Sequence, residues 1–333
     1  MIKVIILCVL FSLSRALYNG MEVQQGQYPY LVYIMVDPGT EGTYACGGGL
    51  ISSRYVMSAG HCSFGSVFQV IVGRIDVKGY HKTDLYNVTN VIRPNDFGKE
   101  ELFDYDDIAI YTLESPILEV ENYTQYMDVG LNEPPVGQPL HVAGFGQLAG
   151  GEDTSKVHWG ITSRAPDQVC IDSFSSYRSE ISYCTNDTQM YSCPGDSGSP
   201  IVVKLEGSTR WVSVGIDSFG WVGTCGSKRP ESVVGKVASM VDFIKQNTQL
   251  APPNFVTVSY TPVATTSAPS VQITSSPVPS LGVTTTAAIT TDSPAPKSQQ
   301  IVDSPKEINA ASLLGGTVAL LAGIIAVMSI TFV

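Results

Sequence analysis

The sequence predicts an all-β domain that ends in one helix and is followed by a disordered stalk. Between Leu17 and about Leu250, short segments rich in β-branched and aromatic residues alternate with Gly, Pro, Asp and Asn. Short strands at such close spacing are typical of an antiparallel sandwich or barrel. Beyond this domain Ser, Thr, Pro, Val and Ala dominate, so the following segment buries too little apolar surface to fold.

Local patterns predict the individual elements. Four short apolar runs are the clearest strand candidates, at residues 31–36, 68–72, 108–111 and 201–203. A helix is predicted at the end of the domain, where four apolar side chains follow helical spacing and a basic residue lies near the last turn. These residues are Val237, Met240, Val241, Ile244 and Lys245.

The N-terminus carries a targeting pattern. Residues 1–16 are predicted to be a secretory signal peptide, because Lys3 precedes an apolar run that ends at a small-residue cleavage site after Ala16. The run is too short to span a bilayer. Cleavage after Arg15 is the alternative. We therefore expect an extracellular protein.

The C-terminus predicts attachment to the cell surface. Residues 251–309 are expected to form an O-glycosylated stalk. Residues 310–333 are uncharged and mostly apolar, which predicts a glycosylphosphatidylinositol (GPI) signal with Asn309 as the attachment site. A single transmembrane helix over the same residues is the alternative.

The cysteines indicate disulfide bonds. Once Cys8 is removed with the signal peptide, six remain, and an even number in a secreted chain favours disulfides over metal ligands. Fifteen pairings are compatible with six cysteines. Asn-x-Thr tripeptides also predict glycosylation at Asn87, Asn122 and Asn186.

Charge and motif content exclude several classes of partner. The formal net charge of −11 argues against nucleic acid and against anionic membrane surfaces as electrostatic partners. The sequence contains no phosphate-binding loop, metal-ligand cluster or cofactor motif, so we expect no cofactor.

Three separate motifs supply a nucleophile, a base and an orienting acid. Ser197 lies in a Gly-rich run, His61 follows Ser-Ala-Gly, and Asp107 precedes an alternating apolar strand. The N–H groups of Gly195 and Ser197 are placed to bind a tetrahedral oxyanion. The other candidates are assigned structural or solvated roles: His81, His141, His158, Asp104 and Asp106.

These motifs, in the order His, Asp, Ser, resemble those of the chymotrypsin-like (trypsin-family) serine endopeptidases. The resemblance covers about residues 17–250. The matching motifs are Leu17–Gly20, Cys46–Ser52, Ser58–Cys62, Asp107–Ala109, Ala143–Gly146, Gly195–Gly198 and Asp217–Gly220, together with the closing helix.

The resemblance implies two antiparallel six-stranded β-barrels with the active site between them. It also implies that Ser197 attacks a peptide carbonyl, that His61 moves the proton and that Asp107 orients His61. Protein or peptide substrates and protein protease inhibitors are the expected partners, and we expect a monomer. The implied disulfides are Cys46–Cys62, Cys170–Cys184 and Cys193–Cys225.

Activation departs from the family pattern. The resemblance implies that a freed amino terminus, here that of Leu17, pairs with Asp196. No propeptide separates the predicted signal from Leu17, so we expect signal peptidase to release the active terminus directly.

The specificity pocket leaves two alternatives open. The resemblance places Tyr191, Ser192, Asp217, Ser218, Gly220 and Glu231 around it. A tyrosine at the floor favours small or medium apolar substrate side chains. A carboxylate at Asp217 or Glu231 would instead bind a cationic side chain. An apparent one-residue insertion near Glu231 leaves the alignment uncertain there. For the whole protein, the alternative to an enzyme is an inactive homologue that serves as a surface binding or inhibitor protein.

Overall fold

The structure is a computed structural model that describes residues 17, 20–41, 43–97, 106–147, 155–186, 190–221, 225, 231–252 and 254–260. The chain divides into two compact units, Met1–Ser267 and Ala268–Val333, and every described residue belongs to the first. The predicted signal peptide, residues 261–309 of the predicted stalk and the predicted anchor lie outside the described residues.

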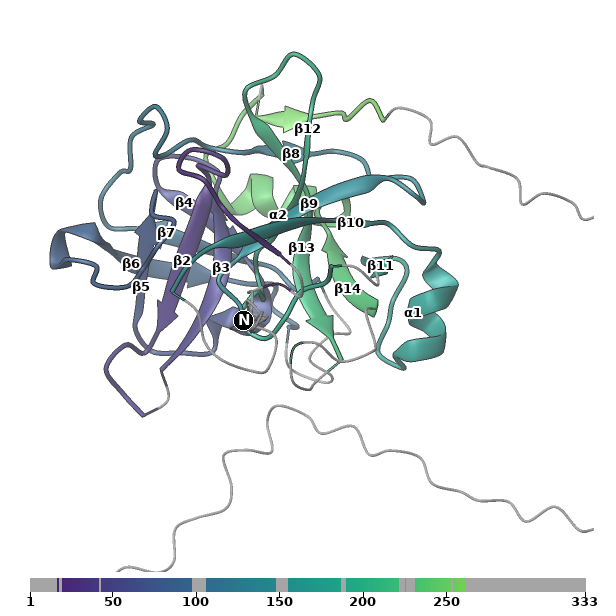
Figure 1. The fold of residues 1–333 in the computed structure, drawn as a ribbon, viewed down its shortest axis with the longest axis horizontal. Helices are drawn as coiled ribbons and strands as arrows, with labels where there is room; N and C mark the ends of the chain where they lie inside the picture. The colour runs from purple at the N-terminus through teal and green to yellow at the C-terminus, as the bar shows by residue number, and fades with distance from the viewer. Residues whose placement is uncertain are drawn as a thin grey trace, which may run out of the picture. The chain divides into compact units, whose positions relative to one another are not determined.

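The first half of the domain is a closed antiparallel barrel of six strands, seen on the left of Figure 1. Strand β2 is almost wholly buried and pairs with a neighbour on each side, so that Val32 lies opposite both Gly48 and Val72. In barrel order the strands are β2 (Leu31–Val36), β3 (Tyr44–Leu50), β4 (Tyr55–Ser58), β7 (Ala109–Leu113), β6 (Leu85–Ile92) and β5 (Phe68–Val72).

The second half is a sheet of nine strands, in the centre and right of Figure 1. Its longest member, β13, is buried along most of its length and pairs with β12, β14 and β8. The strands are β1 (Met21–Glu22), β10 (His158–Ser163), β9 (Pro139–Gly144), β12 (Pro200–Lys204), β13 (Trp211–Gly220), β14 (Glu231–Lys236), β11 (Ser182–Asn186), β8 (Asp128–Gly130) and β15 (Phe255–Val256).

The all-β prediction is confirmed, as are the four predicted strands, which correspond to β2, β5, β7 and β12. The closing helix is α2 (Val237–Asn247), and its four predicted apolar residues are all buried. A second helix, α1 (Asp167–Ser173), was not predicted, because it is short and buries only Cys170. Two short 3₁₀ helices, η1 and η2, span Gly60–Ser63 and Lys82–Asp84.

The three disulfides implied by the resemblance are all present: Cys46–Cys62, Cys170–Cys184 and Cys193–Cys225. The first joins β3 to η1, and the second joins α1 to β11. The first disulfide therefore fixes η1, which contains His61, and the second fixes α1 against the second sheet.

The folded domain continues past the boundary predicted at residue 250. Strand β15 pairs with β8, and Val258 is buried. The main chain of Val258 exchanges two hydrogen bonds with the side chain of Asn132, at 2.8 and 3.1 Å. The predicted stalk boundary is wrong here because a few apolar residues pack within an otherwise polar composition.

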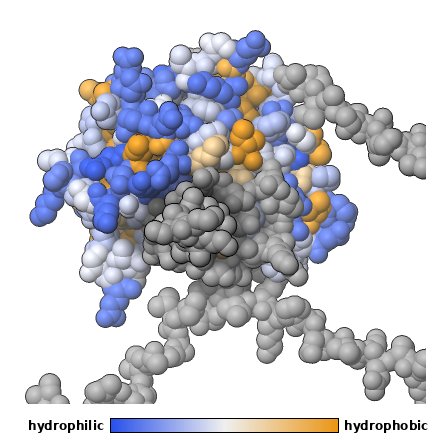
Figure 2. Space-filling view, in the orientation of Figure 1, coloured by the Kyte–Doolittle hydropathy of each residue, from blue (hydrophilic) through white to orange (hydrophobic). Residues whose placement is uncertain are grey.

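The described surface is mostly hydrophilic on the face shown in Figure 2, with small and separate apolar areas. Among the exposed apolar side chains of the described residues, Leu118 lies in the loop between β7 and β8, and Ile171 lies in α1. Among the described residues, neither helix is long and apolar enough to cross a bilayer.

Candidate active site

His61 and Asp107 meet at one rim of the barrel. His61 lies in η1, directly after β4, and Asp107 lies two residues before β7, the strand that pairs with β4. Asp107 Oδ1 accepts the main-chain N–H of His61 at 2.9 Å, and Oδ2 lies 2.8 Å from His61 Nδ1. This pairing of adjacent strands brings the predicted base and acid together.

A third side chain completes this group. Ser218, in β13, donates its hydroxyl hydrogen to Asp107 Oδ2 at 2.5 Å. It therefore links the second sheet to the acid of the first barrel. The predicted pocket position of Ser218 did not reveal this contact, because only the tertiary fold brings β13 against Asp107.

The electrostatics suit a base oriented by an acid. Burial opposes ionisation of Asp107, but the attraction of His61 and the hydrogen bonds from His61 and Ser218 outweigh it and lower the carboxyl pKa. Burial likewise opposes protonation of His61, but Asp107 and Asp217 raise its pKa above the ordinary value. With Nδ1 hydrogen-bonded to a carboxylate, Nε2 is the ring nitrogen left to accept a proton.

Ser197 lies in a tight loop whose glycines are required. Gly195 and Gly198 have φ values of +95° and +81°, which favour glycine. A side chain at Gly198 would also collide with Ser58 Oγ and the Gly47 carbonyl. Main-chain hydrogen bonds of 2.8 and 2.9 Å from this loop to Asp217 hold it against β13.

The main chain of Ser197 is bonded to the first barrel. Its carbonyl accepts the N–H of Gly47, in β3, at 2.8 Å, and lies 3.7 Å from Cys62 Sγ. Cys62 follows His61 and is bridged to Cys46. The predicted nucleophile and the predicted base are therefore fixed to the same short segment of β3.

The two N–H groups predicted to bind the oxyanion are not used in other hydrogen bonds of the described residues. Among the described residues, the N–H groups of Gly195 and Ser197 donate no hydrogen bond. Two unpaired N–H groups in one tight loop are suited to a developing negative charge.

Asp196 is fully buried next to Ser197. Its carboxylate accepts the N–H of Gly146 at 2.8 Å and of Cys193 at 2.9 Å. In the described part of the chain no cationic group pairs with it, and burial raises its pKa to about 8. Leu17 is buried as well, in an apolar cluster that includes Val142.

Of the predicted pocket residues, Ser192 and Asp217 lie together, whereas Ser218 is bonded to Asp107. Ser192 donates to Asp217 Oδ1 at 2.9 Å, and its oxygen lies 3.3 Å from Ser232 Oγ. Ser232 was not predicted, because the insertion near Glu231 blurred the alignment. Tyr191 is also buried.

One sequence prediction near the site is wrong. Asp106 is not a fully solvated charge, because it is partly buried and accepts the hydroxyl hydrogen of Ser239, in α2, at 2.8 Å. Burial raises the pKa of this carboxyl. Asp104 lies outside the described residues. The other histidines make hydrogen bonds away from Asp107: the ring of His141 bonds to Tyr28, the ring of His158 to the Lys156 carbonyl, and the main-chain N–H of His81 to Asp84.

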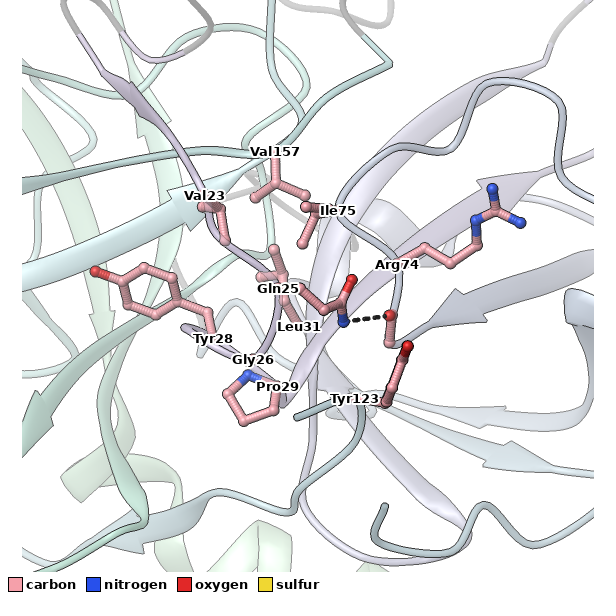
Figure 3. Close-up of a pocket in the computed structure, with 11 residues that line it drawn as sticks. Val23, Gln25, Gly26, Tyr28, Pro29, Leu31, Arg74, Ile75, Tyr123 and Val157 are labelled. Carbon is pink, nitrogen blue, oxygen red and sulfur yellow. Dashed lines mark hydrogen bonds between the residues drawn. The ribbon is translucent and has the colours of Figure 1, made fainter. Parts of the chain in front are cut away.

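The described chain also contains a small cavity away from these residues. It lies between the segment before β2 and the turn after β5, where Gln25 Nε2 donates to the Gly73 carbonyl at 3.0 Å (Figure 3). Its volume of about 10 Å³ is room for one water at most. The cavity is too small for a substrate side chain.

Cys46, His61 and Cys62 are the one group within the described ranges whose atoms are close enough to share a metal ion. Because the two cysteines form a disulfide, their sulfurs are not thiolate ligands. These residues do not fit a metal centre.

The chain is similar to known proteins over most of its folded domain. The trypsin family model matches residues 17–244. Phenoloxidase-activating factor 3 of Holotrichia diomphalia is 26% identical, over 70% of this chain and 72% of its own. Cathepsin G of Mus musculus is 25% identical, over 71% and 87%. A solved structure described as that of GrC superimposes with a TM-score of 0.59 and 26% identity, covering 68% of this chain and 97% of the other. The chain therefore has the chymotrypsin-like fold, belongs to the trypsin family and is a serine-type endopeptidase.

Proposed function

We propose that Ser197, His61 and Asp107 form the catalytic triad of this endopeptidase. The observation that carries the proposal is the chain of hydrogen bonds from Ser218 through Asp107 to His61 Nδ1. It leaves His61 Nε2 to take the proton from Ser197 Oγ as that oxygen attacks the substrate carbonyl carbon. The unpaired N–H groups of Gly195 and Ser197 stabilise the oxyanion that forms.

The reaction then proceeds in two halves. His61 returns the proton to the leaving amine, and an ester remains on Ser197. A water molecule, deprotonated by the same His61 nitrogen, then hydrolyses this ester. Asp107 remains ionised throughout and stabilises the imidazolium.

Covalent labelling tests this proposal. An organophosphonate probe should label the folded protein, and Ser197→Ala should abolish the labelling. Ser199→Ala is the matched control, because Ser199 lies two residues away and its hydroxyl points into the interior. Failure of the correctly folded protein to react would favour the alternative of an inactive surface binding or inhibitor protein.

We further propose that the amine released at Leu17 pairs with Asp196. A buried carboxylate with only N–H partners lacks a counter-charge, and the Leu17 side chain already lies in the interior. N-terminal sequencing of the active enzyme should give Leu17 as the first residue. A start upstream of Leu17 in active material would contradict the proposal.

We propose that the enzyme is held at the cell surface. The uncharged tail from residue 313 to residue 333 supports a GPI signal, with attachment at Asn309. Phosphatidylinositol-specific phospholipase C should release the protein from intact cells. Release by detergent alone would favour a transmembrane helix.

We propose N-glycosylation at Asn87, Asn122 and Asn186. Asn87 and Asn122 are exposed, whereas Asn186 is half-buried at the end of β11. Treatment with peptide N-glycosidase should lower the mass of the secreted protein, and changing each Asn to Gln in turn assigns the sites. An unchanged mass after treatment would contradict the proposal.

A further inference from the structure

The carboxylate of Asp217 is a second buried acid beside the nucleophile, and the mechanism above does not use it. Asp217 is 6% exposed, and its Oδ1 accepts the hydroxyl hydrogen of Ser192 at 2.9 Å. In the described part of the chain it forms no ion pair with a Lys or Arg side chain. A buried carboxylate with one neutral hydrogen-bond donor lacks a counter-charge.

The direction of β13 places this carboxylate on the Ser192 side of the strand, away from Asp107. Consecutive side chains of a strand point to opposite faces. Because Ser218 points toward Asp107, Asp217 points the other way, toward Ser192. Its carbonyl accepts the N–H of Gly198 at 2.8 Å and its N–H donates to the Ser199 carbonyl at 2.9 Å, so the main chain of Asp217 is bonded to the two residues that follow Ser197.

The same reasoning separates Asp217 from Glu231. Ser232 lies opposite Gly220 in the β13–β14 pair, and its hydroxyl oxygen is 3.3 Å from that of Ser192. Ser232 therefore faces the Asp217 side, and Glu231, the preceding residue of the strand, faces away. Glu231 also has a buried carboxylate oxygen without a hydrogen-bond partner among the described residues, but Asp217 is the acid that is directed toward Ser192.

We propose that Asp217 is the specificity-determining residue of this endopeptidase and directs cleavage after Lys or Arg. The ammonium or guanidinium group of the substrate supplies the counter-charge that the buried carboxylate lacks, and Ser192 holds the carboxylate in place. This inference rests on the proposed triad. It favours the cationic alternative for the pocket over the apolar one that Tyr191 suggested.

Several titratable groups surround Asp217. His61 and Asp107 face it from the first barrel, Asp196 from the nucleophile loop and Tyr183 from β11. Burial raises the pKa of Asp217 to about 6, against the lowering effects of Ser192 and His61. The carboxylate is ionised above that pH, so the preference for a cationic substrate should weaken as the pH falls through 6.

The test compares two peptide substrates that differ only in arginine or citrulline before the scissile bond. Citrulline has nearly the shape of arginine but no charge. The wild-type enzyme should prefer arginine by on the order of 100-fold or more in kcat/KM, as for other desolvated charge pairs. Asp217→Asn should bring the ratio near one, and the matched control Glu231→Gln should leave it unchanged. Because both substrates use His61, the pH dependence of their ratio reports Asp217 alone.

Two measurements keep the outcomes distinct. Phosphonate labelling of Asp217→Asn shows whether the variant is folded. Inhibition of the wild-type enzyme by benzamidine, a cationic aryl amidine, should weaken below pH 6, and this measurement does not depend on the variant. A labelled wild-type enzyme that cleaves both substrates equally would overturn this inference and leave the triad intact. An enzyme that is neither labelled nor active on any peptide would overturn the proposed function itself.

Discussion

The carboxylate of Asp107 accepts three hydrogen bonds from residues that lie 46 and 111 positions away in the chain. A local motif identifies Asp107, because an acid before an alternating apolar strand can be buried beside a base. No local motif identifies Ser218 as its partner. At the scale of single residues, local motifs therefore predict the candidate base and acid, and they do not predict the contact of Ser218 with that acid.

Replacing Asp107 tests the orienting role. Asp107→Asn should lower kcat by about 10⁴, the value already established for this triad in the family, because the amide favours the wrong tautomer of His61. Asp106→Asn is the matched control and should have little effect, since Asp106 bonds to Ser239 instead. Kinetics with one peptide substrate measure both. Equal losses in the two variants would contradict the assignment.

Ser199 offers a prediction about stability. Its hydroxyl is fully buried without a hydrogen-bond partner, in the space next to Gly47 and Gly144. An unsatisfied buried polar group costs about 1–3 kcal/mol, so Ser199→Ala should increase the free energy of unfolding by about 1 kcal/mol. Urea denaturation measures the change. A clear loss of stability would mean that the hydroxyl is bonded in solution.

At the scale of elements, β15 and α1 were both missed, for different reasons. Strand β15 has two residues, and its stability comes from pairing with β8 and from Asn132 instead of from a pattern of its own. Helix α1 is short and is held by the Cys170–Cys184 bridge. By contrast, α2 was predicted because its buried apolar residues recur at helical spacing over consecutive turns.

Truncation tests the contribution of β15. A chain that ends at Leu250 should be less stable than one that ends at Tyr260, by about 1.5–3 kcal/mol for the buried Val258 side chain alone. The chain that ends at Tyr260 should match the full-length protein, because it retains β15 and the Asn132 hydrogen bonds. Urea midpoints decide, and equal midpoints for the two truncations would contradict the role of β15.

At the scale of the whole molecule, the first and the last strand of the domain both pair within the second sheet. Strand β1 pairs with β10, and β15 pairs with β8. The segment before β2 therefore lies on the second sheet, and the chain crosses to the first barrel where β2 begins. This placement agrees with the position of Leu17 in the apolar cluster of Val142, which lies in β9, the strand that precedes Gly146, a hydrogen-bond donor to Asp196. The sequence predicted the pairing of Leu17 and Asp196 only through the family resemblance, because no local pattern links the two.

Extension of the N-terminus by one residue tests this arrangement. A chain that begins at Ala16 should lose the Asp196 ion pair. Breaking a buried pair costs about 3–5 kcal/mol, which corresponds to a loss of about 100-fold or more in active enzyme. Active-site titration of the two chains measures this loss. Equal active fractions would contradict the pairing.

The pH dependence of stability should differ between the same two chains. With Asp196 unpaired, its pKa is about 8 in the folded state and about 3.9 in the unfolded state. The folded state then binds more protons between these values, so its stability should fall as the pH rises from 5 to 8. In the chain that begins at Leu17 the ammonium keeps the carboxylate ionised, and this fall should be absent. Thermal unfolding across that pH range measures it.

The hydrogen bond from the Gly47 N–H to the Ser197 carbonyl joins the first barrel to the loop that carries the proposed nucleophile. The two halves of the domain cannot part at this seam without dislodging the residue that attacks the substrate. A molecule whose two halves begin to separate should therefore lose proteolytic activity before its interior is exposed. Partly denatured copies of the protease should then not cleave neighbouring proteins.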